Sequence, residues 1–223
     1  ALPATIENIF QTLVGFFDTL LIAQLGLVAV TAVGLANTIL NVYLAVFLAI
    51  GVGGTALIAR SLGAGQKEKA RQYARQTQEL SIAGGIVFGF ISIFFGRWML
   101  QAMGASGSAL EDAQVFFYWV GGFSLLHASM TSLGTILRAT GDTVTPMKVG
   151  IITNVTNVLL DYFLIFFFFS WDGLGILGTA LGTIFARLLG CYLLTREVQK
   201  SELALSFQKS RHRKDYQELV HVT

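Results

Sequence analysis

Cysteine and proline are almost absent from this chain. The single cysteine, Cys191, has no second cysteine to pair with, so the sequence excludes a disulfide framework and a thiolate metal site. Only two prolines stand against 24 glycines, a balance more typical of long helices in glycine-mediated contact than of short strands joined by turns. The sequence therefore predicts an all-α protein.

Charge is also scarce. Charged residues make up 13% of the 223 residues, whereas a soluble domain usually has about 25%. Hydrophobic residues make up 54%, and the mean hydropathy is +0.66. These values exclude an ordinary soluble fold and predict a helical membrane protein, in which the position of each charge matters more than the formal sum of +2.

Motifs for catalysis and nucleotide hydrolysis are missing. The sequence contains no P-loop, no HExxH, no CxxC pair and no GxSxG nucleophile elbow. We therefore expect neither an enzyme nor a bound cofactor. If the protein moves a substrate, an ion gradient should supply the energy.

Long apolar runs divide the chain into membrane spans. A bilayer core of about 30 Å needs roughly 20 apolar residues per helix, and charges and glycine clusters mark the boundaries between such runs. This pattern predicts a bundle of six transmembrane helices, the second of which is too long for an upright span and should tilt or extend beyond the lipid. The spans lie near 4–25, 29–59, 77–101, 113–137, 146–169 and 175–195.

Basic residues set the orientation of these spans. Thirteen of the fifteen lysines and arginines fall within 60–75, 138–148 and 196–214, all on one side of the predicted bundle. The positive-inside rule places both ends of the chain on the cytoplasmic side of the cytoplasmic (inner) membrane. Topology and phospholipid contact account for these loops, so no nucleic acid partner is expected. The opposite side carries Arg97, Glu111, Asp112 and Asp172.

The two ends of the chain differ in character. Residues 1–198 are predicted to form the six-helix transmembrane lobe, and residues 199–223 a polar cytoplasmic connector. The connector pattern suits a helix lying on the membrane surface, and a flexible linker is the alternative. The first residues lack the features of a secretory signal, and we expect the chain to begin inside a longer one.

Two aspartates lie within the predicted spans. Pro3 and Pro146 each begin a span from the cytoplasmic side, where a missing N–H costs nothing. Asp18 and Asp161 each follow fifteen residues later, about 22 Å along helices that run the same way. The sequence therefore predicts two carboxylates at one depth of the membrane.

Other polar side chains are predicted at or near that depth. Asn157 and Asn154 precede Asp161 by four and seven residues and share its helical face, as Gln11 does for Asp18. Together they predict a polar layer across the bundle, in which amides and hydroxyls either bind a ligand or bridge helices. Its members besides the acids are Gln11, Asn37, Asn41, Asn154, Asn157 and Thr183.

An ionised carboxylate at this depth costs at least about 3 kcal/mol unless water, a cation or a proton satisfies it. We therefore predict that Asp18 and Asp161 exchange a proton or a sodium ion. The alternative is a pair of permanently protonated acids that hydrogen-bond between helices. His127, in the middle of its span, is either a proton relay or a packed neutral side chain.

Five segments of the sequence have a distinctive order and spacing. They are LPATIENIFQTLVGFFDTLLIAQLG, ALIARSLGAGQKEKAR, LRATGDTVTPM, NVLLDYFLIF and GLGILGTALGT. In this order and spacing they resemble the multidrug and toxic compound extrusion (MATE) transporters, and in particular the DinF-like branch, and the resemblance extends over nearly the whole chain.

The resemblance implies the N-terminal six-helix lobe of a twelve-helix transporter, with the C-terminal lobe as its missing partner. It implies a proton- or sodium-binding site at Asp18, Asn157, Asp161 and Thr183, and a cavity lined by Gln11. It further implies a cation-coupled antiporter that exports amphipathic, mostly cationic, organic compounds and drugs. Sodium, if it is the coupling ion, would contact Asp18, Asn157 and Asp161.

Two other functions remain open at this stage. A lipid-linked saccharide flippase shares the architecture, but it needs basic residues around an anionic pyrophosphate, and none is predicted at the level of Asp18. A non-transporting scaffold or a pore is the other alternative. A pore would conduct ions without a change of state, so electrical recording separates it from a transporter.

Overall fold

The computed structural model describes residues 2–166, 174–201 and 203; within the first helix, the side chains described are Ile9 and those from Thr12 onward. The described residues form seven α-helices and no strand, so the predicted all-α fold class is confirmed. The helices are α1 (Leu2–Ala23), α2 (Leu27–Gly63), α3 (Lys67–Ala102), α4 (Gly107–Gly122), α5 (Ser124–Ala139), α6 (Val144–Phe166) and α7 (Ile176–Lys200).

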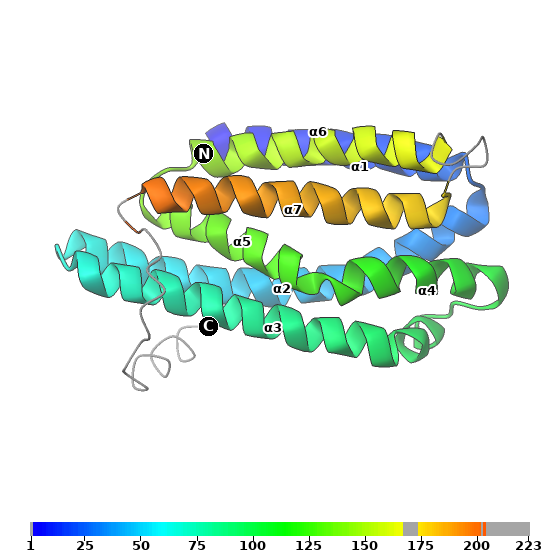
Figure 1. The fold of residues 1–223 in the computed structure, drawn as a ribbon, viewed down its shortest axis with the longest axis horizontal. Helices are drawn as coiled ribbons and strands as arrows, with labels where there is room; N and C mark the ends of the chain where they lie inside the picture. Colours follow the sequence, from blue (N-terminus) through cyan, green and yellow to red (C-terminus); the bar gives the residue numbers. More distant parts are fainter. Residues whose placement is uncertain (1, 167–173, 202, 204–223) are drawn as a thin grey trace.

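The helices form one elongated bundle along a common axis (Figure 1). Helix α1 packs chiefly against α6, and α6 packs against α7. Helix α7 in turn contacts α4 and α5, while α2 packs against α3, α4 and α5. The bundle thus has α1 and α6 at one side and α2 and α3 at the other, with α7 between them (Figure 1).

Four helices are long and apolar enough to cross a membrane: α2, α3, α6 and α7. Helices α4 and α5, bent by 48° relative to each other, are together long and apolar enough for a fifth span when the pair is counted as one. Helix α1 has 22 residues, about 33 Å, and includes the apolar segment Thr12–Ala23. Length and composition therefore support five of the six predicted spans, and α1 has the length of the sixth.

The predicted fourth span, 113–137, is broken at Phe123 between α4 and α5. The bend follows Gly121 and Gly122 and precedes Ser124. The Ser124 hydroxyl donates a hydrogen bond to the backbone carbonyl of Gly121, at the point where the helix is bent. A Cβ at Gly89 of α3 would lie 2.6 Å from the Gly122 carbonyl oxygen. The bend therefore fits closely against a glycine of the neighbouring helix.

Several helices extend beyond their predicted spans. Helix α3 begins at Lys67, ten residues before the predicted start at 77. Its first turns are polar, so hydropathy did not include them in the span although they are helical. Helix α2 has 37 residues, about 55 Å, so it extends well past a 30 Å bilayer core, as its length predicted. The predicted fifth span ends at 169, outside the described residues, and most of the connector 199–223 lies outside them too.

Helix α6 begins with a cap supplied by Asp142. One carboxylate oxygen accepts hydrogen bonds from the backbone N–H groups of Val144, at 3.1 Å, and Thr145, at 2.9 Å. Partial burial raises the pKa of Asp142, but the hydrogen bonds from Thr145 and Val144, together with Lys148, bring the net pKa below its usual value. Pro146 lies in the first turn, where its missing N–H leaves no bond unmade.

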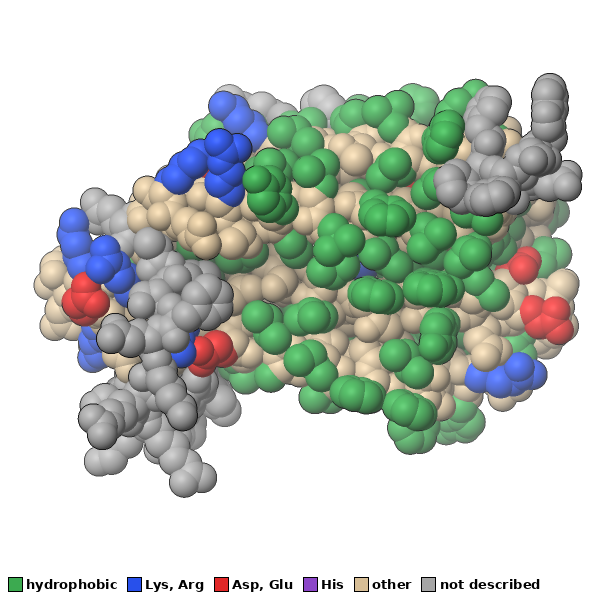
Figure 2. All heavy atoms as spheres, in the orientation of Figure 1, with side chains coloured by type: hydrophobic (Ala, Val, Ile, Leu, Met, Phe, Trp, Pro, Cys, Tyr) green, Lys and Arg blue, Asp and Glu red, His purple; other side chains and the backbone are tan. Residues whose placement is uncertain are grey.

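The surface has a wide apolar middle and charged ends (Figure 2). Large hydrophobic side chains are exposed along the middle, among them Phe94 at 72% and Trp98 at 70%. Blue lysines and arginines gather at one end, and the red acids of the other end lie beside a single blue patch (Figure 2). This distribution is that of a multi-pass membrane protein.

Candidate functional site

The packing of α1 on α6 brings the two membrane aspartates together. Asp18 lies on α1 and Asp161 on α6, and their carboxyl groups are within hydrogen-bonding reach of each other. Both helices enter from the basic end, so the equal spacing from Pro3 and Pro146 carries the two acids to one level. The structure therefore places the two predicted carboxylates in contact.

Asp161 is fully enclosed, with 0% of its surface exposed. Its Oδ2 accepts a hydrogen bond from Asn157 Nδ2 at 3.1 Å. Its Oδ1 and the Oδ1 of Asp18 are both buried, and neither has a hydrogen-bond donor within the described part of the chain. Each unpaired oxygen has capacity for a proton or a cation, because buried polar atoms normally have a partner.

Helix α7 adds a hydroxyl to the pair. Asn157 Nδ2 also lies 3.5 Å from Thr183 Oγ1 with the geometry of a hydrogen bond, and Thr183 donates to the backbone oxygen of Thr179 at 2.9 Å. Asn157 is therefore placed between the α6 carboxylate and the α7 hydroxyl. Three helices, α1, α6 and α7, supply the four side chains predicted as the cation site.

The chemistry of this group suits a proton or a hard cation. Its polar atoms are carboxylate, amide and hydroxyl groups, and oxygen ligands of these kinds are those that hard cations prefer. Two ionised carboxylates in contact within a bundle repel each other, and a shared proton or a bound cation removes that repulsion. The chemistry of the site therefore suits the binding of a single positive charge.

The other predicted cavity residues do not join this group. Asn37 and Asn41 are exposed on α2, and Asn154 is half-buried on α6 one turn before Asn157. None of the three makes a hydrogen bond with another residue that the structure describes. The side chain of Gln11 lies outside the described residues.

Two further residues of α7 support the site and were not predicted. Gly182 lies against Asp161, and a Cβ at this position would overlap Asp161 Oδ1. A Cβ at Gly178, one turn earlier, would lie 2.9 Å from the backbone carbonyl of Leu164. The hydroxyl of Thr179, on the same helix, is buried and lacks a partner among the described residues. The spacing Gly178-x3-Gly182 is the small-residue pattern that could have predicted this close contact.

Arg187, the basic residue in the middle of α7, lies apart from the acid pair. Arg187 follows Gly182 by five residues, about 8 Å along the helix, and interacts electrostatically with His127 of α5. Cys191, one turn further on, contacts the α5 backbone at Leu126, 3.2 Å away. His127 packs edge-on against Phe47 at 6.1 Å between ring centres. Arg187 therefore lies on the α5 side of α7, whereas Gly182 lies on the α6 side.

Comparison with known proteins gives a consistent result. The family model described as MatE matches residues 3–163. The chain is 32% identical over 211 residues to the uncharacterized transporter YisQ of Bacillus subtilis, covering 94% of this chain and 46% of that protein. It is 33% identical over 202 residues to the probable multidrug resistance protein NorM of Thermotoga maritima, covering 91% and 44%.

The fold of the chain also matches solved structures of transporters. A multidrug resistance MATE family transporter in an outward-facing conformation superposes with a TM-score of 0.90 at 23% identity, covering 98% of this chain and 49% of the other. The chain thus spans about half the length of the relatives it matches. Because the family model covers most of the chain and the fold matches half of a MATE transporter, the chain belongs to the MatE family of transporters.

Proposed function

We propose that this chain is the ion-coupling lobe of an antiporter that exports amphipathic, mostly cationic, organic compounds and drugs. Asp18 and Asp161 alternately bind a proton or sodium ion and release it, assisted by Asn157 and Thr183. The observation that carries this proposal is the contact between the buried carboxyl group of Asp161 and the half-buried one of Asp18, whose buried Oδ1 atoms have no donor in the described residues.

Ion binding at this pair can move a helix. Two like unit charges about 4 Å apart repel by about 4 kcal/mol at an effective dielectric constant of 20. An energy of that size changes a two-state equilibrium by about three orders of magnitude. Helix α1 packs chiefly against α6 and much less against α2. The position of α1 therefore depends on whether a positive charge occupies the carboxyl pair.

The substrate class follows from the charge of the site and the character of the relatives. A carboxyl pair that has released its ion is anionic, so it attracts an organic cation and repels an organic anion. NorM of Thermotoga maritima is named a probable multidrug resistance protein. A second lobe completes the substrate cavity. The basic end of the bundle lies on the cytoplasmic side of the inner membrane.

The test is ion-driven efflux from vesicles that contain the full-length protein. A proton or sodium gradient is imposed, and export of a fluorescent organic cation is followed in the parent and in Asp18→Asn and Asp161→Asn. Each substitution should lower gradient-driven efflux by at least about tenfold, because a neutral amide cannot exchange the ion. Glu111→Gln, an exposed acid at the far end of the bundle, is the control and should pump like the parent.

Three results would contradict the proposal. Equal pumping by the parent and both aspartate variants would show that the pair does not couple the ion. Ion conductance at channel rates, without substrate and without saturation, would favour a pore instead. Export of a lipid-linked saccharide in preference to organic cations would favour a flippase.

A further inference from the structure

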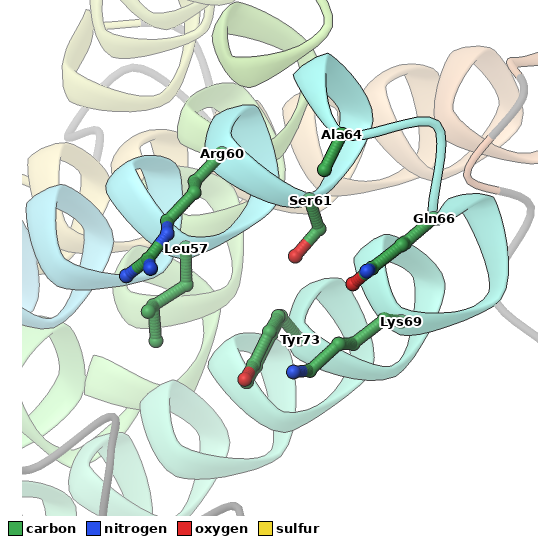
Figure 3. A pocket seen from close by; sticks show the side chains of 7 residues that line it. All are labelled: Leu57, Arg60, Ser61, Ala64, Gln66, Lys69 and Tyr73. Carbon is green, nitrogen blue, oxygen red and sulfur yellow. The ribbon is translucent and has the colours of Figure 1, made fainter.

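A polar pocket lies at the basic end of the bundle, in the loop that joins α2 to α3 (Figure 3). It has a volume of about 290 Å³. The loop turns sharply at Gly65, and the backbone N–H of Gln66 donates to the carbonyl of Ser61 at 2.9 Å, which closes the turn beside the pocket. The lining residues are Leu57, Arg60, Ser61, Ala64, Gln66, Lys69 and Tyr73.

The charged side chains of this pocket are both cations. Arg60 comes from the last turn of α2 and Lys69 from the first turns of α3, on either side of the pocket (Figure 3). Both are exposed, and neither forms an ion pair with another residue in the described part of the chain. The nearest acid along the chain, Glu68, is already paired with Arg71 at 2.7 Å. The pocket therefore has two cations and no acid to neutralise them.

Neutral donors complete the lining. The Ser61 hydroxyl and the Gln66 amide point into the pocket in Figure 3, and the Tyr73 hydroxyl lies beside the Lys69 ammonium group. Lys69 Nζ is 5.8 Å from the centre of the Tyr73 ring, which helps to hold the lysine side chain in place. Arginine and lysine beside hydroxyl and amide donors form the usual surroundings of a phosphate group.

The location identifies the source of the phosphate. The pocket lies at the end of the bundle where positive residues gather, next to the apolar parts of α2 and α3 that are long enough to cross a membrane (Figure 2). The headgroups of the negatively charged cytoplasmic leaflet are the anionic groups nearest to that end of the bundle. We propose that the α2–α3 pocket binds the phosphate-bearing headgroup of an anionic phospholipid.

This site is separate from the ion-coupling pair. Asp161 lies seventeen residues beyond Val144, about 25 Å along α6 from the same basic end. A lipid headgroup in the pocket therefore contacts neither Asp161 nor Asp18. Its effect would be to hold the α2–α3 loop at the membrane surface, and its binding can be measured without a transport assay.

The experiment measures lipid binding to the full chain in detergent by native mass spectrometry. The probes are phosphatidylglycerol and phosphatidylcholine with the same acyl chains, since only the first has a net negative headgroup. The parent should bind phosphatidylglycerol about tenfold more tightly. The double variant Arg60→Gln/Lys69→Gln should lose about tenfold of that affinity, because each cation beside the headgroup contributes several-fold.

The matched control removes two cations elsewhere at the same end. Lys148 and Arg196 are exposed and do not line the pocket, so Lys148→Gln/Arg196→Gln changes the net charge equally. It should keep the parent's affinity within about twofold, because neither side chain lines the pocket that holds the headgroup. Arg60→Lys should recover most of the binding, and Ser61→Ala should weaken it about threefold through one lost hydrogen bond.

Three results would overturn the inference. Equal losses in the two double variants would mean that the whole basic end attracts lipid without a site. No loss in Arg60→Gln/Lys69→Gln would mean that the pocket does not bind the headgroup. If inorganic phosphate alone raises the melting temperature of the parent but not of the pocket variant, while phosphatidylglycerol shows no preference over phosphatidylcholine, the pocket binds a free anion.

Discussion

Gly182 of α7 lies directly against the carboxyl group of Asp161 on α6. A Cβ at position 182 would overlap Asp161 Oδ1 and come within 3.1 Å of its Cγ. We expect Gly182→Ala to turn the carboxyl away from Asp18 and to cost about 1–3 kcal/mol of stability through overpacking. Ion-driven efflux and the melting temperature in detergent should both fall.

The control for this substitution is Gly34→Ala on α2, where a Cβ would meet nothing within 4 Å. It should leave both measurements unchanged. If Gly182→Ala melted and pumped like Gly34→Ala, the close packing of α7 on the carboxyl would have no functional role.

Asn157 links the acid of α6 to the hydroxyl of α7. Because its amide donates to Asp161 at 3.1 Å, Asn157→Ala should leave that carboxylate without its partner. Groups that orient an ion ligand typically contribute 10- to 100-fold to ion affinity, so we expect a loss of about that size. The measurement is the proton or sodium concentration that half-saturates efflux.

The matched control on the same helix is Val155→Ala, which removes an exposed apolar side chain. Thr183→Ser should also have a half-saturating ion concentration near that of the parent, since it keeps the hydroxyl that Asn157 contacts at 3.5 Å. Thr183→Val, which lacks the hydroxyl, should need a higher ion concentration. A half-saturating concentration that is the same in Asn157→Ala and Val155→Ala would remove Asn157 from the site.

The bend between α4 and α5 depends on a glycine of α3. A Cβ at Gly89 would lie 2.6 Å from the Gly122 carbonyl oxygen, so Gly89→Ala should push the two helices apart at the cost of about 1–3 kcal/mol. A Cβ at Gly84 would have its nearest atoms at 3.8 Å and 3.9 Å, which is ordinary van der Waals contact. Thermal unfolding should therefore separate Gly89→Ala from Gly84→Ala, and equal melting temperatures would mean that the bend tolerates a methyl group.

The cap at Asp142 makes stability depend on pH. Its pKa is held below the usual value of about 3.9, so its contribution is complete at neutral pH and is lost as the pH falls through the folded-state pKa. Asp142→Ala should cost about 0.5–2 kcal/mol at pH 7. The difference in melting temperature from the parent should shrink in acid. Glu111→Gln, an exposed acid, controls for general charge effects, and a difference that grows as the pH falls would contradict this role.

The sequence was most informative where one physical constraint dominates. The cost of charge in lipid directed attention to Asp18 and Asp161, and the equal spacing from two prolines predicted their common depth. Hydropathy located the helices but not their ends, because polar turns such as those after Lys67 continue a helix outside the apolar region. That is why α3 begins ten residues earlier than predicted.

Other features depend on contacts between helices, which hydropathy does not encode. The break at Phe123 follows from the glycines beside it and from the close contact with Gly89. The sequence pattern predicted 113–137 as one span without a break. The role of Gly182 appears only once α7 is packed against α6. Asn37 and Asn41 were predicted from depth alone, and depth does not determine which side of α2 contacts another helix.

The most direct test of the central claim is the protonation of the carboxyl pair itself, followed by infrared difference spectroscopy. The parent should show a carboxylic acid band in acid that disappears when the pH is raised or when sodium is added at fixed pH. Acids outside the pair, such as Asp142, also protonate in acid, so the band of the pair is the component that the parent shows and the double variant Asp18→Asn/Asp161→Asn lacks. A parent spectrum without such a component, or a component that responds to neither pH nor sodium, would contradict ion exchange at Asp18 and Asp161.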